Sequence, residues 1–195
     1  MGVIPFLVLV FVAAGLLIYV GTLYNGLVAL RNDIDKAWAN IDVLLKQRHD
    51  ELPRLADVCK GYMQYERETL QQLTEARAKY AAAVTVNQKA QLSGTLSASV
   101  QRVFATAENY PDLKANATFL ELQQRITGLE NQIADRREFY NDAINLFNTR
   151  IRQMPDALLA RMAGFEARQM FQMTASEKLY VAVGLNPVTR GIGVD

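Results

Sequence analysis

The sequence is poor in the residues from which most enzymatic and metal sites are built. Its 195 residues include one cysteine and one histidine, too few for an intramolecular disulfide framework or a cysteine-based zinc or iron–sulfur site. No G-x-S-x-G, P-loop or G-x-G-x-x-G segment is present. With a formal net charge of only +1, the chain gives no electrostatic reason to expect a nucleic-acid partner. We therefore expect no catalytic residue, no cofactor and no metal.

Charge is also missing from one end of the chain. The sequence has 21 Lys and Arg and 20 Asp and Glu residues, and none of these 41 lies in residues 1–30. Residues 3–23 form an uncharged apolar run, long enough to cross a hydrocarbon core of about 30 Å as a helix. Tyr19 and Tyr24 stand near the end of this run, where amphipathic rings favour a membrane interface. These features predict a single-pass anchor that contacts lipid through residues 3–23.

Two other interpretations of the apolar run are a cleaved signal peptide and a buried core helix. A signal peptide normally has a basic start and a shorter apolar segment, and this run has neither. No cation precedes the run, whereas Arg31, Lys36 and Lys46 follow it. The positive-inside rule then predicts an external N-terminus and a cytoplasmic domain.

Apolar residues recur every three or four positions through most of the remaining chain, which is typical of amphipathic helices. The first stripe begins inside the uncharged segment and comprises Leu27, Leu30, Ile34, Trp38, Ile41 and Leu45. Because no strong breaker precedes it, we expect the anchor to continue directly into the first domain helix. Pro53 should kink or interrupt this helix, because proline removes a backbone hydrogen bond. The stripe then resumes from Leu55 to Tyr80.

Two further helices are predicted from their first residues. Thr85 with Gln88 fits a capping box for a helix that ends near Asn109, and Thr118 with Glu121 fits a second one. The apolar stripe that follows Thr118 and Glu121 continues for about nine helical turns. Such a long helix must bury its stripe against partners of similar length.

These patterns predict an all-α fold, in which an N-terminal transmembrane helix is continuous with an antiparallel bundle of three or four long helices. Beyond Pro155 we expect a short amphipathic helix over residues 156–171, a possible short strand in LYVAV and a flexible tail. The predicted organisation is an anchor and juxtamembrane helix at 1–30, a long-helix bundle at 31–155, and an amphipathic helix with the C-terminal tail at 156–195.

Four blocks of sequence carry a family resemblance. They are YNGLVALRNDIDKAWANIDVLLKQR from Tyr24, LPRLADVCKGY from Leu52, YPDLKANATFLELQQRI from Tyr110 and ENQIADRREFYNDAINLFNTRI from Glu130. Together they resemble the LemA family of bacterial membrane-anchored helical proteins. The resemblance implies an anchor in the bacterial inner membrane followed by a long-helix bundle. It implies no enzymatic activity, since family members resemble scaffolding or membrane-associated accessory proteins, some of them encoded near membrane proteases.

One polar cluster, DRREFYND, contains Arg136, Arg137 and Tyr140. Arg136 falls on the apolar stripe, so we expect it to be buried or half-buried and paired with a carboxylate of the first helix, such as Asp35 or Asp42. Such a pair would fix helix register at a cost in desolvation. The alternative is a site for a protein partner or a lipid headgroup.

Five other positions have less specific signals. Trp38 has stripe spacing and is expected in the core, with an interfacial or inter-subunit position as the alternative. Tyr110 and Pro111 should shape a turn or, secondarily, a recognition loop. His49 lies among charged residues and is expected at the solvated surface, and Cys59 is expected to be a small buried hydrophobe.

The predicted C-terminal helix is the best candidate for an interaction. It places Leu158, Met162 and Phe165 on one side. Because its charges are balanced, it lacks the basic face typical of helices that bind anionic lipid. We expect it to pack on its own bundle or on another subunit.

Three functions are consistent with these features. The first is a membrane-anchored, non-enzymatic scaffold that self-assembles as a homo-oligomer in the membrane plane and organises membrane components. The second is a monomeric adaptor that presents a helical face to a membrane enzyme such as a protease. The third, an enzyme, would have to rely on carboxylates and arginine, such as Glu130, Asp135 and Arg136.

Overall fold

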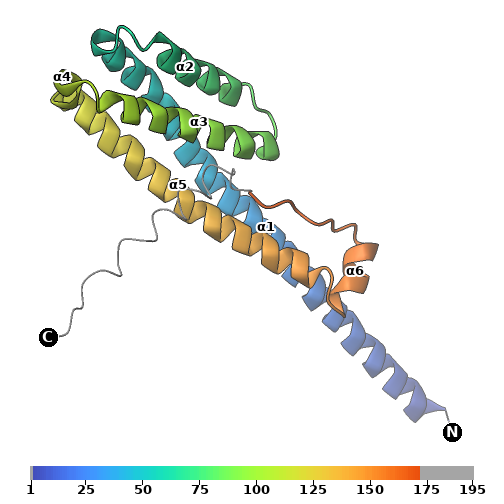
Figure 1. The fold of residues 1–195 in the computed structure, drawn as a ribbon. Helices are drawn as coiled ribbons and strands as arrows, with labels where there is room; N and C mark the ends of the chain where they lie inside the picture. Colours follow the sequence, from blue (N-terminus) through green and yellow to red (C-terminus); the bar gives the residue numbers. More distant parts are fainter. Residues whose placement is uncertain (1, 172–195) are drawn as a thin grey trace, which may run out of the picture. The chain divides into compact units, whose positions relative to one another are not determined.

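The computed structural model describes residues 2–171 of the chain. This part contains six helices and no strand, which confirms the all-α prediction (Figure 1). The helices are α1 (Val3–Tyr62), α2 (Arg67–Ala81), α3 (Val86–Ala107), α4 (Pro111–Lys114), α5 (Ala117–Arg150) and α6 (Asp156–Met162). The suggested strand at 179–183 and the tail after it lie outside the described residues.

The apolar run and the first domain helix form one continuous helix, as predicted. α1 has 60 residues, and every residue from Val3 to Thr22 is exposed, whereas the first buried side chain is Leu27. The most apolar part of α1 is long enough to cross a membrane and is 0% buried. A core helix would be mostly buried, so that alternative is wrong. One long apolar N-terminal helix of this kind is what a single-pass anchor requires.

The predicted interruption at Pro53 does not occur, because α1 continues through it to Tyr62. Leu52, Leu55 and Cys59 around it are fully or almost fully buried. Burial of one leucine contributes about 1.5–3 kcal/mol, and a proline inside a helix costs about 3 kcal/mol. Packing on both sides of Pro53 therefore outweighs the missing backbone hydrogen bond. The break comes instead at residues 63–66, which the sequence pattern did not indicate.

The chain divides into two compact units, and both α1 and α5 contribute to each. Unit 1 contains Met1–Ile41 and Arg136–Met170. Within it, Arg150 on α5 reaches Gly26 on α1, and Tyr140 on α5 contacts Trp38 on α1. Residue numbers fall along one helix as they rise along the other, so the two helices are antiparallel there. α6 lies beside this pair (Figure 1).

Unit 2 contains Asp42–Asp135 and, of the remaining described residues, Phe171. Its helices are the second part of α1, the α2–α3 hairpin, α4 and the first part of α5. Apolar side chains from each of the long segments fill its interior, and among the fully buried ones are Leu45, Leu55, Leu96, Val100, Leu113 and Ile126. Phe104 and Phe119 meet edge to face with ring centroids 6.2 Å apart. Unit 2 is thus a small helical bundle with its own core.

The predicted capping box at the start of α3 is present. The Gln88 N–H donates to Thr85 Oγ1 at 3.2 Å, and the Thr85 N–H donates to Gln88 Oε1 at 3.2 Å. The second predicted cap, at Thr118, is wrong. α5 begins at Ala117, and Asn116 Oδ1 accepts a hydrogen bond from the Phe119 N–H at 3.0 Å. Asn116 is therefore the N-cap, a position for which asparagine is among the preferred residues.

Exchange of the two candidate caps for alanine should separate them. Asn116→Ala is expected to lower the free energy of unfolding by about 1 kcal/mol, because Phe119 loses its acceptor. Thr118→Ala should change it by less than about 0.5 kcal/mol, since Thr118 is exposed inside the helix and alanine is a better helix former. Urea unfolding of the full chain in detergent, followed by circular dichroism, measures both. A larger loss for Thr118→Ala would contradict this assignment.

The last described helix is shorter than the predicted helix over 156–171. α6 ends at Met162 because Gly164 takes a φ of +71°, a conformation that other residues rarely adopt. The Phe165 N–H then donates to the Ala160 carbonyl at 2.9 Å. This is the hydrogen bond that closes a Schellman motif, with glycine at the position after the cap. Residues 165–171 continue without helical structure.

Candidate functional site

The most unusual group in unit 2 is a fully buried arginine. Arg48 on α1 lies three residues after Leu45 and four before Leu52, so it shares their inward face. Its side chain is 0% exposed. Burial of a charged guanidinium costs several kcal/mol unless other groups pair with it and accept its hydrogen bonds. The position of Arg48 therefore requires partners from the neighbouring helices.

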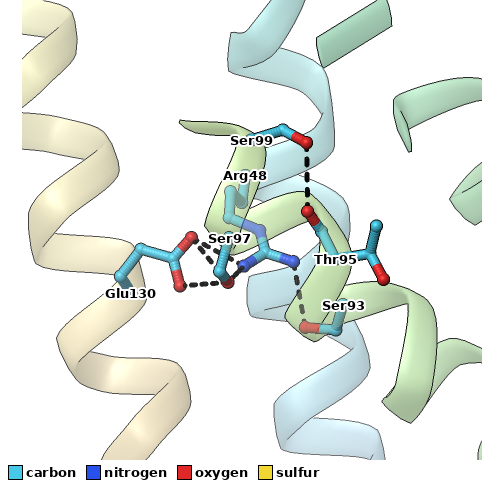
Figure 2. Close-up of polar contacts among 6 residues, drawn as sticks. All are labelled: Arg48, Ser93, Thr95, Ser97, Ser99 and Glu130. Atoms are coloured by element: carbon cyan, nitrogen blue, oxygen red, sulfur yellow. Dashed lines mark hydrogen bonds and ion pairs between the residues drawn. The ribbon is translucent and has the colours of Figure 1, made fainter. Parts of the chain in front are cut away.

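Three side chains from two other helices supply these partners (Figure 2). Arg48 Nη1 donates to Glu130 Oε1 on α5 and to Ser97 Oγ on α3, each at 2.7 Å. Arg48 Nη2 donates to Ser93 Oγ at 3.0 Å, and Ser97 Oγ lies 2.9 Å from Glu130 Oε2. We call Arg48, Ser93, Ser97 and Glu130 the Arg48 cluster. Its members join α1, α3 and α5.

The geometry of the Arg48 cluster suits a structural role. Ser93 and Ser97 are one helical turn apart on α3, so both hydroxyls face the same guanidinium. Glu130 neutralises the charge, but its side chain is only 16% exposed and has its own desolvation cost. A shift of α1 against α5 by one turn would leave a buried charge unpaired, and a shift of α3 would move a serine hydroxyl away from the guanidinium. The cluster therefore specifies the register of α1, α3 and α5.

A second ion pair and one aromatic contact join α1 to α3 and to α2. Lys89 Nζ on α3 is 2.6 Å from Asp42 Oδ1. The His49 and Tyr80 rings lie 6.0 Å apart, and the His49 side chain is only 18% exposed, so the expected solvated position is wrong. Burial, with a smaller contribution from the Asp42 charge and opposed by Arg48, raises the pKa of Tyr80 to about 12. Tyr80 thus stays protonated at neutral pH.

The expected burial of Arg136 is wrong. Arg136 is exposed and lies over the Phe139 ring, 6.0 Å from its centroid, whereas Arg137 is the buried member of the pair. Seven residues separate the buried Ile133 and Tyr140, and with 3.6 residues per turn the stripe between them can pass through position 136 or 137. Packing, which the sequence does not show, selects position 137.

The predicted positions Trp38 and Tyr140 come together in unit 1. Trp38 is half-buried and its ring centroid lies 5.8 Å from that of the buried Tyr140. Burial raises the pKa of Tyr140, with the Asp35 carboxylate acting in the same direction and Arg168 opposing it. Tilted aromatic pairs at this distance stabilise packing by about 0.5–1.5 kcal/mol. This pair contributes to holding α5 on α1.

Tyr110 and Pro111 lie where α3 ends and α4 begins, in unit 2. Tyr110 is the N-cap residue of α4 and Pro111 its first residue, a position that suits proline. The Tyr110 hydroxyl donates to Glu66 Oε1 at 3.3 Å. Desolvation and the nearby Glu66 carboxylate raise the pKa of Tyr110. The two residues thus form a turn that contacts the start of α2.

The three residues predicted on one side of the C-terminal helix have different surroundings. Phe165 is half-buried in unit 1, with ring centroids 6.0 Å from Tyr24 and 6.1 Å from Phe147. Leu158 and Met162 are exposed. Phe165 therefore packs on its own unit, whereas the other two side chains do not.

Cys59 is buried, as predicted, and its thiol should react slowly. Burial raises the pKa of Cys59 from 9.0 to about 11, which lowers the thiolate fraction at pH 8 by about 100-fold. We expect the native chain to react with a disulfide reagent at least 100-fold more slowly than the urea-unfolded chain. Because the folded state binds the Cys59 thiol proton more tightly than the unfolded state does, this proton stabilises the folded chain. The stabilisation is present below about pH 9 and is lost as the pH rises towards 11.

An exposed cysteine provides the matched control for this experiment. Thr95→Cys in a Cys59→Ala background places a thiol on the exposed side of α3. It should react at nearly the same rate in the native and unfolded chains. Equal reactivity of Cys59 in both states would show that α1 opens readily around it.

Sequence reasoning missed the Arg48 cluster. The sequence pattern suggests Glu130 only as a possible catalytic group and gives Arg48 no role. One signal was present: Arg48 stands at stripe spacing, and Ser93 and Ser97 stand four residues apart on the apolar side of α3. A charge and two hydroxyls on inward faces indicate a buried polar network. Nothing in the spacing identifies Glu130 as the partner.

Comparisons with known proteins show what this chain is similar to. A family model described as LemA family matches residues 37–184, about three quarters of the chain. The match extends beyond Ile151, where the last of the four blocks quoted above ends. Protein LemA of Metamycoplasma hominis is 27% identical over 165 residues, which cover 84% of this chain and 75% of that protein. Magnetosome proteins MamQ 1 and MamQ 2 of Paramagnetospirillum magneticum are each 32% identical over 79 residues, covering 40% of this chain and 29% of theirs.

Proposed function

The chain belongs to the LemA family, and from this premise we propose that it is a membrane-anchored, non-enzymatic structural protein. In this proposal it self-assembles in the plane of the bacterial inner membrane and organises membrane components there. The observation that carries the proposal is α1: its first twenty residues are exposed and apolar, and the same helix continues into both compact units. In this proposal one continuous helix connects the lipid phase to the helical domain.

The buried chemistry of the domain supports a structural role. Glu130, a carboxylate that an enzymatic mechanism would need, is paired with the buried Arg48. Arg136, another candidate, stacks on an exposed phenylalanine. Glu130 thus contributes to packing between helices, and Arg136 covers an aromatic ring of its own helix. We therefore favour a protein that acts through its surfaces.

One face of α5 supports self-assembly. Phe139 and Leu146 are 62% and 51% exposed and lie seven residues, about two turns, apart. Residues at this spacing share a helix face, and exposed apolar side chains on one face are typical of protein contacts. Because a membrane confines the molecules to two dimensions, even a weak lateral contact can produce an assembly.

The size of the detergent-extracted particle tests this proposal. We expect light scattering after gel filtration to give a protein mass that is a multiple of 21.8 kDa and rises with concentration. Phe139→Lys with Leu146→Lys should shift the particle towards the monomer, whereas Glu138→Lys on the same helix should not. A strictly monomeric wild-type protein at every concentration would contradict self-assembly.

The same face is compatible with the alternative, a monomeric adaptor for a membrane enzyme such as a protease. The exposed Phe139 and Leu146 would then contact a different protein. Cross-linking in cells through a photoreactive residue at position 139 distinguishes the two. Self-cross-links support assembly, and a heteromeric product of fixed stoichiometry supports the adaptor.

The topology of the anchor follows from the flanking charges. Arg31, Lys36 and Lys46 follow the apolar run and no cation precedes it, so we propose a cytoplasmic domain and an external N-terminus. A membrane-impermeant thiol reagent applied to intact cells should label a cysteine placed at Gly2 and not one placed at Thr95. Labelling of the second position alone would reverse this orientation.

A further inference from the structure

We infer that residues 151–165, which we call the α6 corner, form a second membrane contact that lies in the lipid headgroup region beside the point where α1 leaves the bilayer. The inference rests on the proposed anchor. Its evidence is separate, however, because it comes from how unit 1 holds α6. The occupant to which it commits is a lipid surface that contains anionic headgroups.

Two contacts set the position of α6 along α1. At the start of α6, Arg150 Nε donates to Asp156 Oδ2 at 2.7 Å. The same guanidinium lies against Gly26 on α1, 3.6 Å from the point that a Cβ atom would occupy if this residue had one. After the end of α6, the Phe165 ring lies 6.0 Å from the Tyr24 ring. Tyr24 and Gly26 are only about 3 Å apart along the helix axis. Both ends of α6 are therefore held at the same level of α1.

That level coincides with the end of the lipid-exposed part of α1. All residues of α1 up to Thr22 are exposed, and the first buried side chain is Leu27. The first charged residue is Arg31. A membrane boundary must lie between the apolar run and that charge, since charged side chains avoid the hydrocarbon core. Tyr24 is at the depth where aromatic rings are enriched. The α6 corner is thus at the membrane surface if α1 spans it.

The outward side of the α6 corner is apolar. Met154, Leu158 and Met162 are 76%, 61% and 80% exposed. Leu158 and Met162 are four residues apart and share one side of α6, whereas Ala157 and Ala160 face inward and are buried. Three large exposed apolar side chains at this depth can insert between lipid headgroups, as those of interfacial helices do.

The charges around this apolar surface are mainly positive. Arg152 and Arg161 in the α6 corner and Arg168 just after it are exposed, while Asp156 is buried and already paired with Arg150. The sequence alone counts Asp156 against these cations, but the structure removes it from the surface, which leaves Glu166 as the exposed acid of residues 151–168. Each surface cation adds to the attraction for anionic lipid. Charge complementarity therefore favours lipid over a protein interface, whose core is depleted of charge.

Spin labels on the full chain in vesicles test the inference. In a Cys59→Ala background, Leu158→Cys and Met162→Cys report on the α6 corner, Val10→Cys reports on the anchor, and Glu138→Cys is a control on the exposed side of α5. The vesicles contain phosphatidylglycerol and phosphatidylethanolamine, and collision rates are measured with oxygen and with a water-soluble nickel chelate. We expect labels at 158 and 162 to favour oxygen over the chelate several-fold more than the label at 138, and less than the label at 10.

Each other result has a distinct meaning. If labels at 158 and 162 collide with the chelate as freely as the label at 138, while the label at 10 lies in lipid, the inference is wrong and the anchor stands. If the label at 10 is itself in water, the proposed anchor fails and the inference fails with it. If the labels at 158 and 162 are shielded from both reagents and show dipolar broadening, a second copy covers this surface and lipid does not.

Discussion

Two arginines in the centre of the apolar run are expected to release the protein from membranes. Val12→Arg and Leu16→Arg each place a charge near the middle of an exposed apolar helix segment. An arginine at this depth costs about 2.5–3.5 kcal/mol on insertion scales, so the two together cost about 6 kcal/mol. This corresponds to a change of about 10⁴-fold in the balance between inserted and free protein. Flotation of cell membranes on a density gradient and carbonate extraction measure the inserted fraction.

The control places the same residue elsewhere on the same helix. Val43 is an exposed apolar residue of α1 that lies in unit 2, and Val43→Arg should leave membrane association unchanged. Intact mass of the extracted wild-type protein separates the anchor from a cleaved signal peptide, because only an anchor keeps the apolar run. Membrane association of the double variant at the wild-type level would show that α1 does not anchor the chain.

Arg48→Met is expected to destabilise the folded chain by about 3–5 kcal/mol. The substitution preserves much of the buried volume but leaves the Glu130 carboxylate and two serine hydroxyls without their common donor. Breaking one partner of a buried ion pair has a cost of this size because the other charge stays desolvated. Since the Glu130 side chain is 16% exposed, water compensates part of it and we expect the lower end of the range. Urea unfolding in detergent, followed by circular dichroism, gives the change.

A double-mutant cycle distinguishes a lost pair from lost packing. Arg48→Met with Glu130→Met removes both charges, and we expect it to be more stable than Arg48→Met alone, because no unpaired charge is left inside. Lys60→Met is the matched control, since Lys60 and Asp57 lie 3.0 Å apart on α1 with both side chains exposed, a surface pair worth less than about 1 kcal/mol. Additive effects of the two cluster substitutions would show that the pair is not coupled.

The start of α3 was predictable from neighbouring residues in the sequence, whereas the start of α5 was not. The cap at Thr85 was predictable because Gln88 stands three residues away and the two satisfy each other's backbone donors. Thr118 offers the same spacing to Glu121, yet α5 begins at Ala117 with Asn116 as its cap. The Asn116 amide also donates to the Tyr62 hydroxyl at 3.1 Å, a contact that depends on α1 and that no local pattern contains.

The candidate site was less predictable than the fold. The periodicity of α5 identified its inward face, but not whether Arg136 or Arg137 lies on it. Arg48 and Glu130 are 82 residues apart in the chain, and their pairing exists only once α1 and α5 have packed. A single sequence contains no signal for such a pair, because any of several carboxylates on inward faces satisfies the same local rules.

The sequence by itself determined the exposed apolar anchor, its continuity with the first domain helix and the helical class of the described domain. These features depend on runs and periods within one segment, where composition and hydrogen bonding along the chain decide the outcome. Only the tertiary structure decided that Arg48 is fully buried, that α1 passes through Pro53 and that Asp156 leaves the surface to pair with Arg150. The free energy in each of these cases comes from groups that lie on other helices or turns, and folding alone brings those groups within contact distance.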